Sequence, residues 1–96
     1  MDEYSKIKDE GIVEFLDEYA NTGEPLGGFL HACVANDFVG AICQASLENM
    51  ANLLAIAQYI YNRMPSKCWG SAAKVTDWEQ HNGLAGLNDD ALNGRR

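Results

Sequence analysis

The sequence lacks any uninterrupted apolar segment of about eighteen residues, the length that a membrane-crossing helix needs. We therefore expect no membrane partner. The chain begins Met-Asp-Glu-Tyr-Ser-Lys, which is acidic, whereas a secretory signal peptide begins with a basic segment and continues with an apolar one. These absences predict a cytoplasmic protein.

Cysteine is scarce, and its spacing fits no known framework. Cys33, Cys43 and Cys68 are widely separated and form no Cys-x-x-Cys pair, which argues against both a disulfide scaffold and a zinc site. Cys33 and Cys43 stand in apolar segments and are predicted to be small core residues. Cys68 stands in a turn, where its thiol could be exposed.

Catalytic motifs are also missing. The chain has no His-Glu-x-x-His, Gly-x-Ser-x-Gly, P-loop or dinucleotide-binding pattern. Of its two histidines, His31 is predicted to be half-buried and hydrogen-bonded, and His81 to interact with the dipole at a helix C-terminus. The acidic residues are spaced along a solvent-facing surface and form no convergent acid–base pair. We predict a protein that is not an enzyme and that holds no metal or cofactor.

Positive charge is rare at the N-terminal end. The net charge of the chain is −7, and residues 1–24 contribute eight acids and two lysines, a net of −6. Such a segment repels phosphates, so direct nucleic-acid binding is not expected. Two interpretations stay open: a solvated helix face that favours solubility, or a surface for a basic protein partner.

The apolar pattern predicts an all-α fold. Residues 9–20 show the three-to-four-residue period of an amphipathic helix, and the Gly and Pro that follow would end it. A short buried helix is predicted over 27–34. Asn36 or Asp37 then caps a helix that ends near residue 45.

The longest helix is predicted to begin at Ser46 and to end before Pro65. Its apolar stripe, which we expect to face the core, comprises Met50, Leu53, Leu54, Ala57, Ile60, Tyr61 and Met64. A last helix begins at Ser71 and ends near Gly83. The expected architecture is a compact bundle of about four to five short helices with one longer central helix. Residues 1–82 form its single domain, and 83–96 form a tail that is flexible or docks on a partner.

Two glycine-preceded helix starts suggest binding. Glycine lets a ligand approach the backbone, and free N–H groups at a helix start can hold a phosphate or carboxylate. Trp69 could stack on a base, and Arg63 could supply positive charge. Alternatively, the glycines permit close packing and Trp69 covers the end of the core. The candidate ligand-binding residues are Gly27, Gly28, Asn36, Asn62, Arg63, Trp69, Gly70 and Ser71.

An ordered series of motifs resembles a family of short, uncharacterised bacteriophage proteins. The resemblance covers about residues 12–80, and this chain departs from the family in two places. Ser46 stands where the family usually has Asp, and Ala72-Ala73 replaces a Pro-Glu pair, which leaves that helix start more receptive to an anion. The motifs are Gly27-Gly28-Phe29-Leu30, Ala35-Asn36-Asp37-Phe38, Asn49, Tyr59-x-Tyr61-Asn62 with Pro65, Cys68-Trp69-Gly70-Ser71 and Val75-x-x-Trp78.

The resemblance implies a phage or prophage origin and a place in the cytoplasm of a bacterial host. We expect a non-enzymatic accessory protein that counters a host defence by sequestering a nucleotide-type immune signal. The alternative is an acidic inhibitor that blocks a basic surface on a host protein. Self-association into a homo-oligomer is expected as well, because short helices leave little apolar area to bury.

Overall fold

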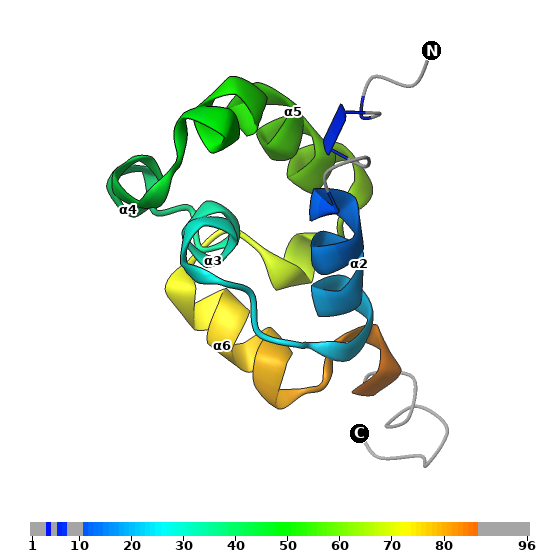
Figure 1. The fold of residues 1–96 in the computed structure, drawn as a ribbon. Coiled ribbons are helices and arrows are strands. Elements are labelled where there is room, and N and C mark those ends of the chain that lie inside the picture. Colours follow the sequence, from blue (N-terminus) through cyan, green and yellow to red (C-terminus); the bar gives the residue numbers. More distant parts are fainter. Residues whose placement is uncertain (1–3, 5, 8–10, 87–96) are drawn as a thin grey trace.

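The computed structural model describes Tyr4, residues 6–7 and residues 11–86, and these residues contain helices and no strand. The all-α prediction, with one longer helix, is confirmed (Figure 1). A further helical turn covers residues 83–86, whereas the predicted tail from 87 onward lies outside the described residues. The helices are α2 (Ile12–Thr22), α3 (Gly28–Val34), α4 (Phe38–Gln44), α5 (Leu47–Arg63), the 3-10 turn η1 (Ser66–Cys68) and α6 (Ala72–Gln80).

Local capping sets most of the helix boundaries. The side chains of Asp37, Ser46 and Ser71 accept hydrogen bonds from backbone N–H groups three residues on, at 3.0, 3.0 and 3.2 Å. Each bond satisfies a donor that the first turn leaves unpaired. α2 ends at Gly23, whose φ of 78° lies in the left-handed region that glycine adopts at low cost. The predicted starts of α4, α5 and α6 are therefore confirmed.

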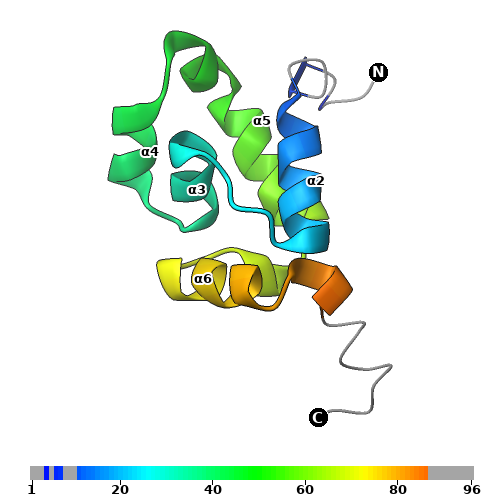
Figure 2. The same cartoon turned by 60° about the horizontal axis from the view of Figure 1, so that its bottom comes forward.

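The helices pack around one core. Figures 1 and 2 show α2 beside α5, α6 across one end of both, and α4 on the outside next to α3. The buried cluster contains Tyr4, Ile7, Ile12, Leu16, Tyr19, Ala20, Val34, Ile56, Tyr59, Ile60, Met64, Cys68, Val75 and Trp78. The core thus lies mainly between α2, α5 and α6.

Hydrogen bonds close the corner where α2 meets η1 and α6. The Tyr19 hydroxyl donates to the Cys68 carbonyl at 2.7 Å. The Trp78 indole Nε1–H donates to the carbonyls of Tyr19 and Ala20 at 3.1 and 3.2 Å. These donors satisfy carbonyls that the end of α2 and the turn would otherwise leave unpaired. We call this region the α2–α6 corner.

Two glycines bring backbones into contact in the same corner. Gly83 has a φ of +64°, and a Cβ built there would lie 2.7 Å from the backbone N of Gly23. The residue therefore needs glycine both for its conformation and for the space around it. The short helical turn after it places Leu84 against the core.

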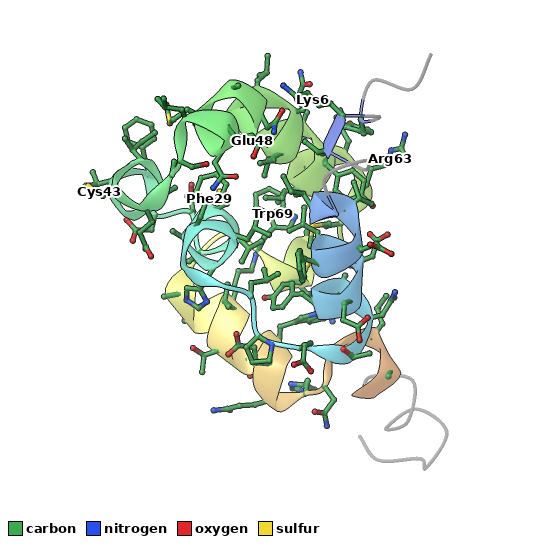
Figure 3. All side chains as sticks on the ribbon, viewed as in Figure 1. Lys6, Phe29, Cys43, Glu48, Arg63 and Trp69 are labelled. Atoms are coloured by element: carbon green, nitrogen blue, oxygen red, sulfur yellow. The ribbon has the colours of Figure 1, made fainter. Side chains whose placement is uncertain are left out.

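The cysteine prediction is wrong in its distribution. Cys43 is exposed and Cys33 is only partly buried, whereas Cys68 is fully buried. The Cys68 Sγ donates to the Pro65 carbonyl at 3.0 Å, so η1 folds the thiol inward. α4 carries Cys43 on the outside of the molecule, as Figure 3 shows.

The predicted core-facing stripe of α5 is also wrong in part. Ile60 and Met64 are buried, but Leu54 is 71% exposed and Tyr61 is 73% exposed. The buried face of the helix instead carries Asn52, Ile56, Tyr59 and Ile60. α2 covers that face, whereas α4 stands away from the other and leaves a cavity. On α2, Phe15 of the predicted apolar stripe is likewise 62% exposed.

Candidate functional site

A cavity of about 400 Å³ lies between α3, α4 and α5, beside Trp69. Most of its wall consists of aliphatic and aromatic side chains. The lining residues are Ala32, Cys33, Asn36, Asp37, Phe38, Ala41, Ile42, Leu53, Ala57, Ile60, Tyr61 and Trp69. Alanines at four of these positions leave the space that larger side chains would fill.

A tight turn between α3 and α4 shapes one wall of the cavity. Asn36 adopts a left-handed conformation with a φ of 62°, and the Asp37 N–H donates to the Ala32 carbonyl at 2.9 Å. The turn sends α4 back against α3, and the Asp37 carboxylate caps α4. The cavity wall is therefore set by local hydrogen bonds.

Trp69 is held in place from two sides. The N–H of Gly70 donates to the carbonyl of Val34 at 2.8 Å, which ties the turn after η1 to the end of α3. Gly70 has a φ of +122°, a conformation that favours glycine. The rings of Tyr61 and Trp69 meet edge to face with centroids 5.9 Å apart. Figure 3 shows Trp69 in the middle of the molecule, between α3 and α5.

The indole nitrogen of Trp69 is the unusual atom of the site. Its Nε1–H is buried and has no hydrogen-bond partner among the described residues. A buried donor without a partner costs about 1–3 kcal/mol. An acceptor on a molecule inside the cavity would remove that cost.

The cavity carries little charge. Residues 9–62, which include every helix of its wall, contain no lysine and no arginine. Burial raises the pKa of the Cys33 thiol to about 11, so the thiol is neutral and unreactive near pH 7. The Asp37 carboxylate already accepts the N–H of Gly40. The site therefore suits an apolar or aromatic group more than an anion.

The described residues offer no group of three or more His, Cys, Asp or Glu side chains able to hold a metal ion. The Nδ1 of His31 lies 4.0 Å from the Glu79 carboxylate, and the Nδ1 of His81 lies 3.1 Å from the Asp77 carbonyl at the end of α6. Neither histidine lines the cavity. Among the helices of the described ranges, none has both the length and the apolar character to cross a membrane.

The structure brings four of the candidate ligand-binding residues together and separates two. Asn36 and Trp69 line the cavity, with Gly70 and Ser71 directly after Trp69. Ser71 caps α6 through its hydroxyl. Arg63 and Asn62 lie elsewhere: the guanidinium stacks over the Tyr4 ring at 5.0 Å, and the Asn62 amide donates to the Tyr4 hydroxyl at 3.3 Å. Figure 3 shows Arg63 at the outer edge of the molecule, away from Trp69.

The remaining two candidates mark the start of α3. A Cβ at Gly28 would overlap the Gln44 side chain, so this glycine permits the close packing of α3 and α4. Gly27 precedes the helix without a side-chain cap and has open space around it. Neither glycine lines the cavity.

Sequence reasoning missed most of the cavity wall, including Phe38, Ala41, Ile42, Leu53 and Ala57. A signal was present in the sequence, because small residues alternate with large apolar ones on α4 and α5. Assigning that stripe to the core concealed it.

No protein-family model matches the chain, and no match exists among the curated proteins or the solved structures. The functional argument therefore starts from the cavity and from the exposed surfaces of the described helices.

Proposed function

We propose that this protein is a non-enzymatic binding protein that takes the flat aromatic part of a small molecule, such as the base of a nucleotide, into the cavity beside Trp69. The observation that carries the proposal is the buried Nε1–H of Trp69, which has no partner among the described residues. A ring nitrogen or carbonyl oxygen of a base would accept this hydrogen bond.

The dimensions and lining of the cavity support the proposal. Its volume of about 400 Å³ falls in the range of small-molecule sites, which are mostly apolar with a few fixed polar groups. Tyr61 and Trp69 offer aromatic edges and faces against which a second ring can pack. Asn36, at the turn between α3 and α4, adds an exposed amide that can donate or accept.

The charge distribution limits what the cavity can recognise. The lining contains no cation, and Arg63 lies with Tyr4 on another side of the molecule. Phosphate groups would therefore stay in solvent, and recognition would rest on the base. Tight binding of a polyphosphate through its charges is not part of this proposal.

Sequestration of such a molecule suits an accessory protein of a bacteriophage that counters a host defence. A protein that only removes a signal needs affinity and abundance, and it needs no catalytic group. The resemblance of the motifs to short phage proteins is the support for this biological setting.

Thermal-shift and calorimetric titrations with nucleosides, mononucleotides and cyclic nucleotides would test the proposal. A ligand that binds the native state raises the melting temperature in proportion to its saturation. We expect a nucleoside to bind as tightly as its nucleotide. Trp69→Phe, which keeps the ring and removes the donor, should weaken binding about tenfold, the equivalent of roughly 1.4 kcal/mol.

Tyr61→Phe is the matched control, because it also keeps the aromatic ring of a lining residue and should bind within about twofold of the wild type. Absence of stabilisation by every compound at millimolar concentration would reject the proposal. Binding that requires the phosphates and ignores Trp69→Phe would reject it equally.

A second candidate function rests on the outer face of α2. Phe15 is 62% exposed there, between the exposed acids Glu14 and Glu18. An apolar side chain flanked by acids fits a partner protein with a basic, partly apolar surface. This is the acidic inhibitor expected from the charge of residues 1–24.

The structure refines the test of that candidate. Asp17 accepts the Tyr59 hydroxyl at 2.6 Å, so its substitution would also disturb packing. The variant Glu14→Lys/Glu18→Lys leaves that bond intact and should abolish capture of a basic host protein. Undiminished capture would eliminate this function, and Glu24→Lys serves as a control outside the face.

A further inference from the structure

One stripe of α5 has the spacing of a coiled-coil seam. Leu47, Met50, Leu54, Ala57 and Tyr61 follow one another at alternating intervals of three and four residues. This heptad spacing places the five side chains along one side of a helix. We call these five residues the α5 seam.

The fold leaves the α5 seam uncovered. Leu47 is 91% exposed, Leu54 is 71% exposed and Tyr61 is 73% exposed. Asn52 and Tyr59 are buried, and they occupy the heptad positions opposite the seam. α5 therefore carries two apolar faces: one packs on the core of its own chain, and the other has no cover among the described residues.

The surroundings of the α5 seam favour a second copy of this chain over a charged partner. Residues 38–62 carry a single charged side chain, Glu48. The positions beside the seam hold Ala51 and Gln58 on one side, and Leu53 and Ile60 on the other. Two such faces can meet without burying like charges, whereas a surface meant for a charged partner would carry the opposite charge.

The exposed area is close to what a stable pair needs. Phe38 on α4 is 73% exposed and lines the same cavity as Ala57 and Tyr61, which extends the apolar surface beyond α5. Since a large apolar residue offers roughly 150–200 Å² when exposed, the seam without Ala57, together with Phe38, leaves on the order of 650 Å² open per copy. Standard interfaces bury about 800 Å² per partner.

We propose that two copies of this protein pair through their α5 seams, around a two-fold axis near Leu54. Leu54 is the middle residue of the α5 seam, so it faces its own counterpart in both parallel and antiparallel arrangements. A seam of two heptads is short for an isolated peptide. Here α5 is already folded against its own core, so pairing does not also have to order the helix.

This inference does not depend on a ligand for the cavity. Ala57 and Tyr61 belong to both surfaces, but pairing is driven by the apolar area of the α5 seam. Association without any nucleotide would leave the proposed function untouched, and ligand binding by a monomer would leave it standing while removing the dimer.

Sedimentation equilibrium from micromolar to millimolar protein would test the pairing. We expect a reversible monomer–dimer equilibrium in the wild type. Leu54→Glu should weaken the dimer by at least about tenfold, because two unpaired carboxylates would face each other. Phe15→Glu is the matched control, since it adds the same charge at a position of similar exposure on α2, and it should leave the dimer constant unchanged.

A crosslinking experiment gives a second, independent readout. In a background with Cys33→Ser and Cys43→Ser, Leu54→Cys should form a disulfide-linked dimer under mild oxidation, whereas Phe15→Cys should not. Thermal melts establish that each variant is folded. A wild type that stays monomeric at millimolar concentration, or a dimer that Leu54→Glu does not weaken, would overturn the inference.

Discussion

The two sides of α5 differ in almost every physical respect. On the side of α2 and α6, Ile56 and Tyr59 are buried, and the polar groups of Tyr19 and Trp78 are hydrogen-bonded. On the side of α4, large side chains such as Leu54 are open to solvent, a cavity remains, and the Trp69 donor has no partner among the described residues. The difference indicates that one side supplies stability and the other is available for binding.

A pair of leucine truncations should give the largest contrast. Leu16 is fully buried in α2, and Leu54 is mostly exposed on α5. Leu16→Ala should destabilise the protein by about 2–5 kcal/mol through lost burial and a cavity. Leu54→Ala should stay within about 0.5 kcal/mol in urea unfolding at low protein concentration, where association does not contribute. Similar losses for both variants would refute the division.

Two glycine substitutions probe how tightly the α2–α6 corner is closed. Gly83 and Gly11 both have positive φ, at 64° and 81°, but only Gly83 has backbone atoms within contact distance of a new Cβ. Gly83→Ala should cost about 2–4 kcal/mol from conformation and overpacking together. Gly11→Ala should cost only the conformational part, about 1–2 kcal/mol. Equal changes in the free energy of unfolding would show that the corner can open to admit a methyl group.

The two tryptophans allow a smaller but more specific comparison. Trp78→Phe removes the donor to two carbonyls of α2 and should cost about 1–3 kcal/mol. Trp69→Phe removes a donor that has no partner among the described residues, so the free energy of unfolding should change by less than about 1 kcal/mol. A large loss at Trp69 would mean that its N–H is satisfied in solution.

High pH should weaken the closed side by the smallest amount. Burial, followed by the hydrogen bond to Asp17, raises the pKa of Tyr59 from 10.0 to about 12. Because the folded pKa lies above the unfolded one, this contribution is fully present below pH 10 and is lost as the pH rises toward 12. Tyr59→Phe should lose less stability than the wild type over that interval, as measured by urea unfolding at each pH. An identical decline in both proteins would contradict this assignment.

The sequence was sufficient to predict the helices, because their limits depend on neighbouring residues. Asp37, Ser46 and Ser71 bond to N–H groups within their own first turns, and Gly23 ends α2 in a left-handed conformation. Such interactions can be inferred from short patterns.

The sequence was not sufficient to predict what covers each helix. The apolar stripe of α5 was correctly identified as apolar, but periodicity does not indicate which stripe packs inside the chain. The positions of Cys68 and Trp69 depend on distant partners: the Tyr19 hydroxyl bonds to the Cys68 carbonyl, and Gly70 bonds to Val34. The cavity arises from these long-range contacts, so only its candidate residues Asn36 and Trp69 were anticipated.

The two indoles also differ in a way that light can detect. Trp78 is 3% exposed and donates to two carbonyls, so its emission should be blue-shifted and resistant to soluble quenchers. Trp69 lies at the cavity with the Tyr61 ring beside it. Any molecule that enters the cavity alters the surroundings of one fluorophore while the other stays constant. The protein thus contains, without any label, both a reporter of occupancy and its internal reference.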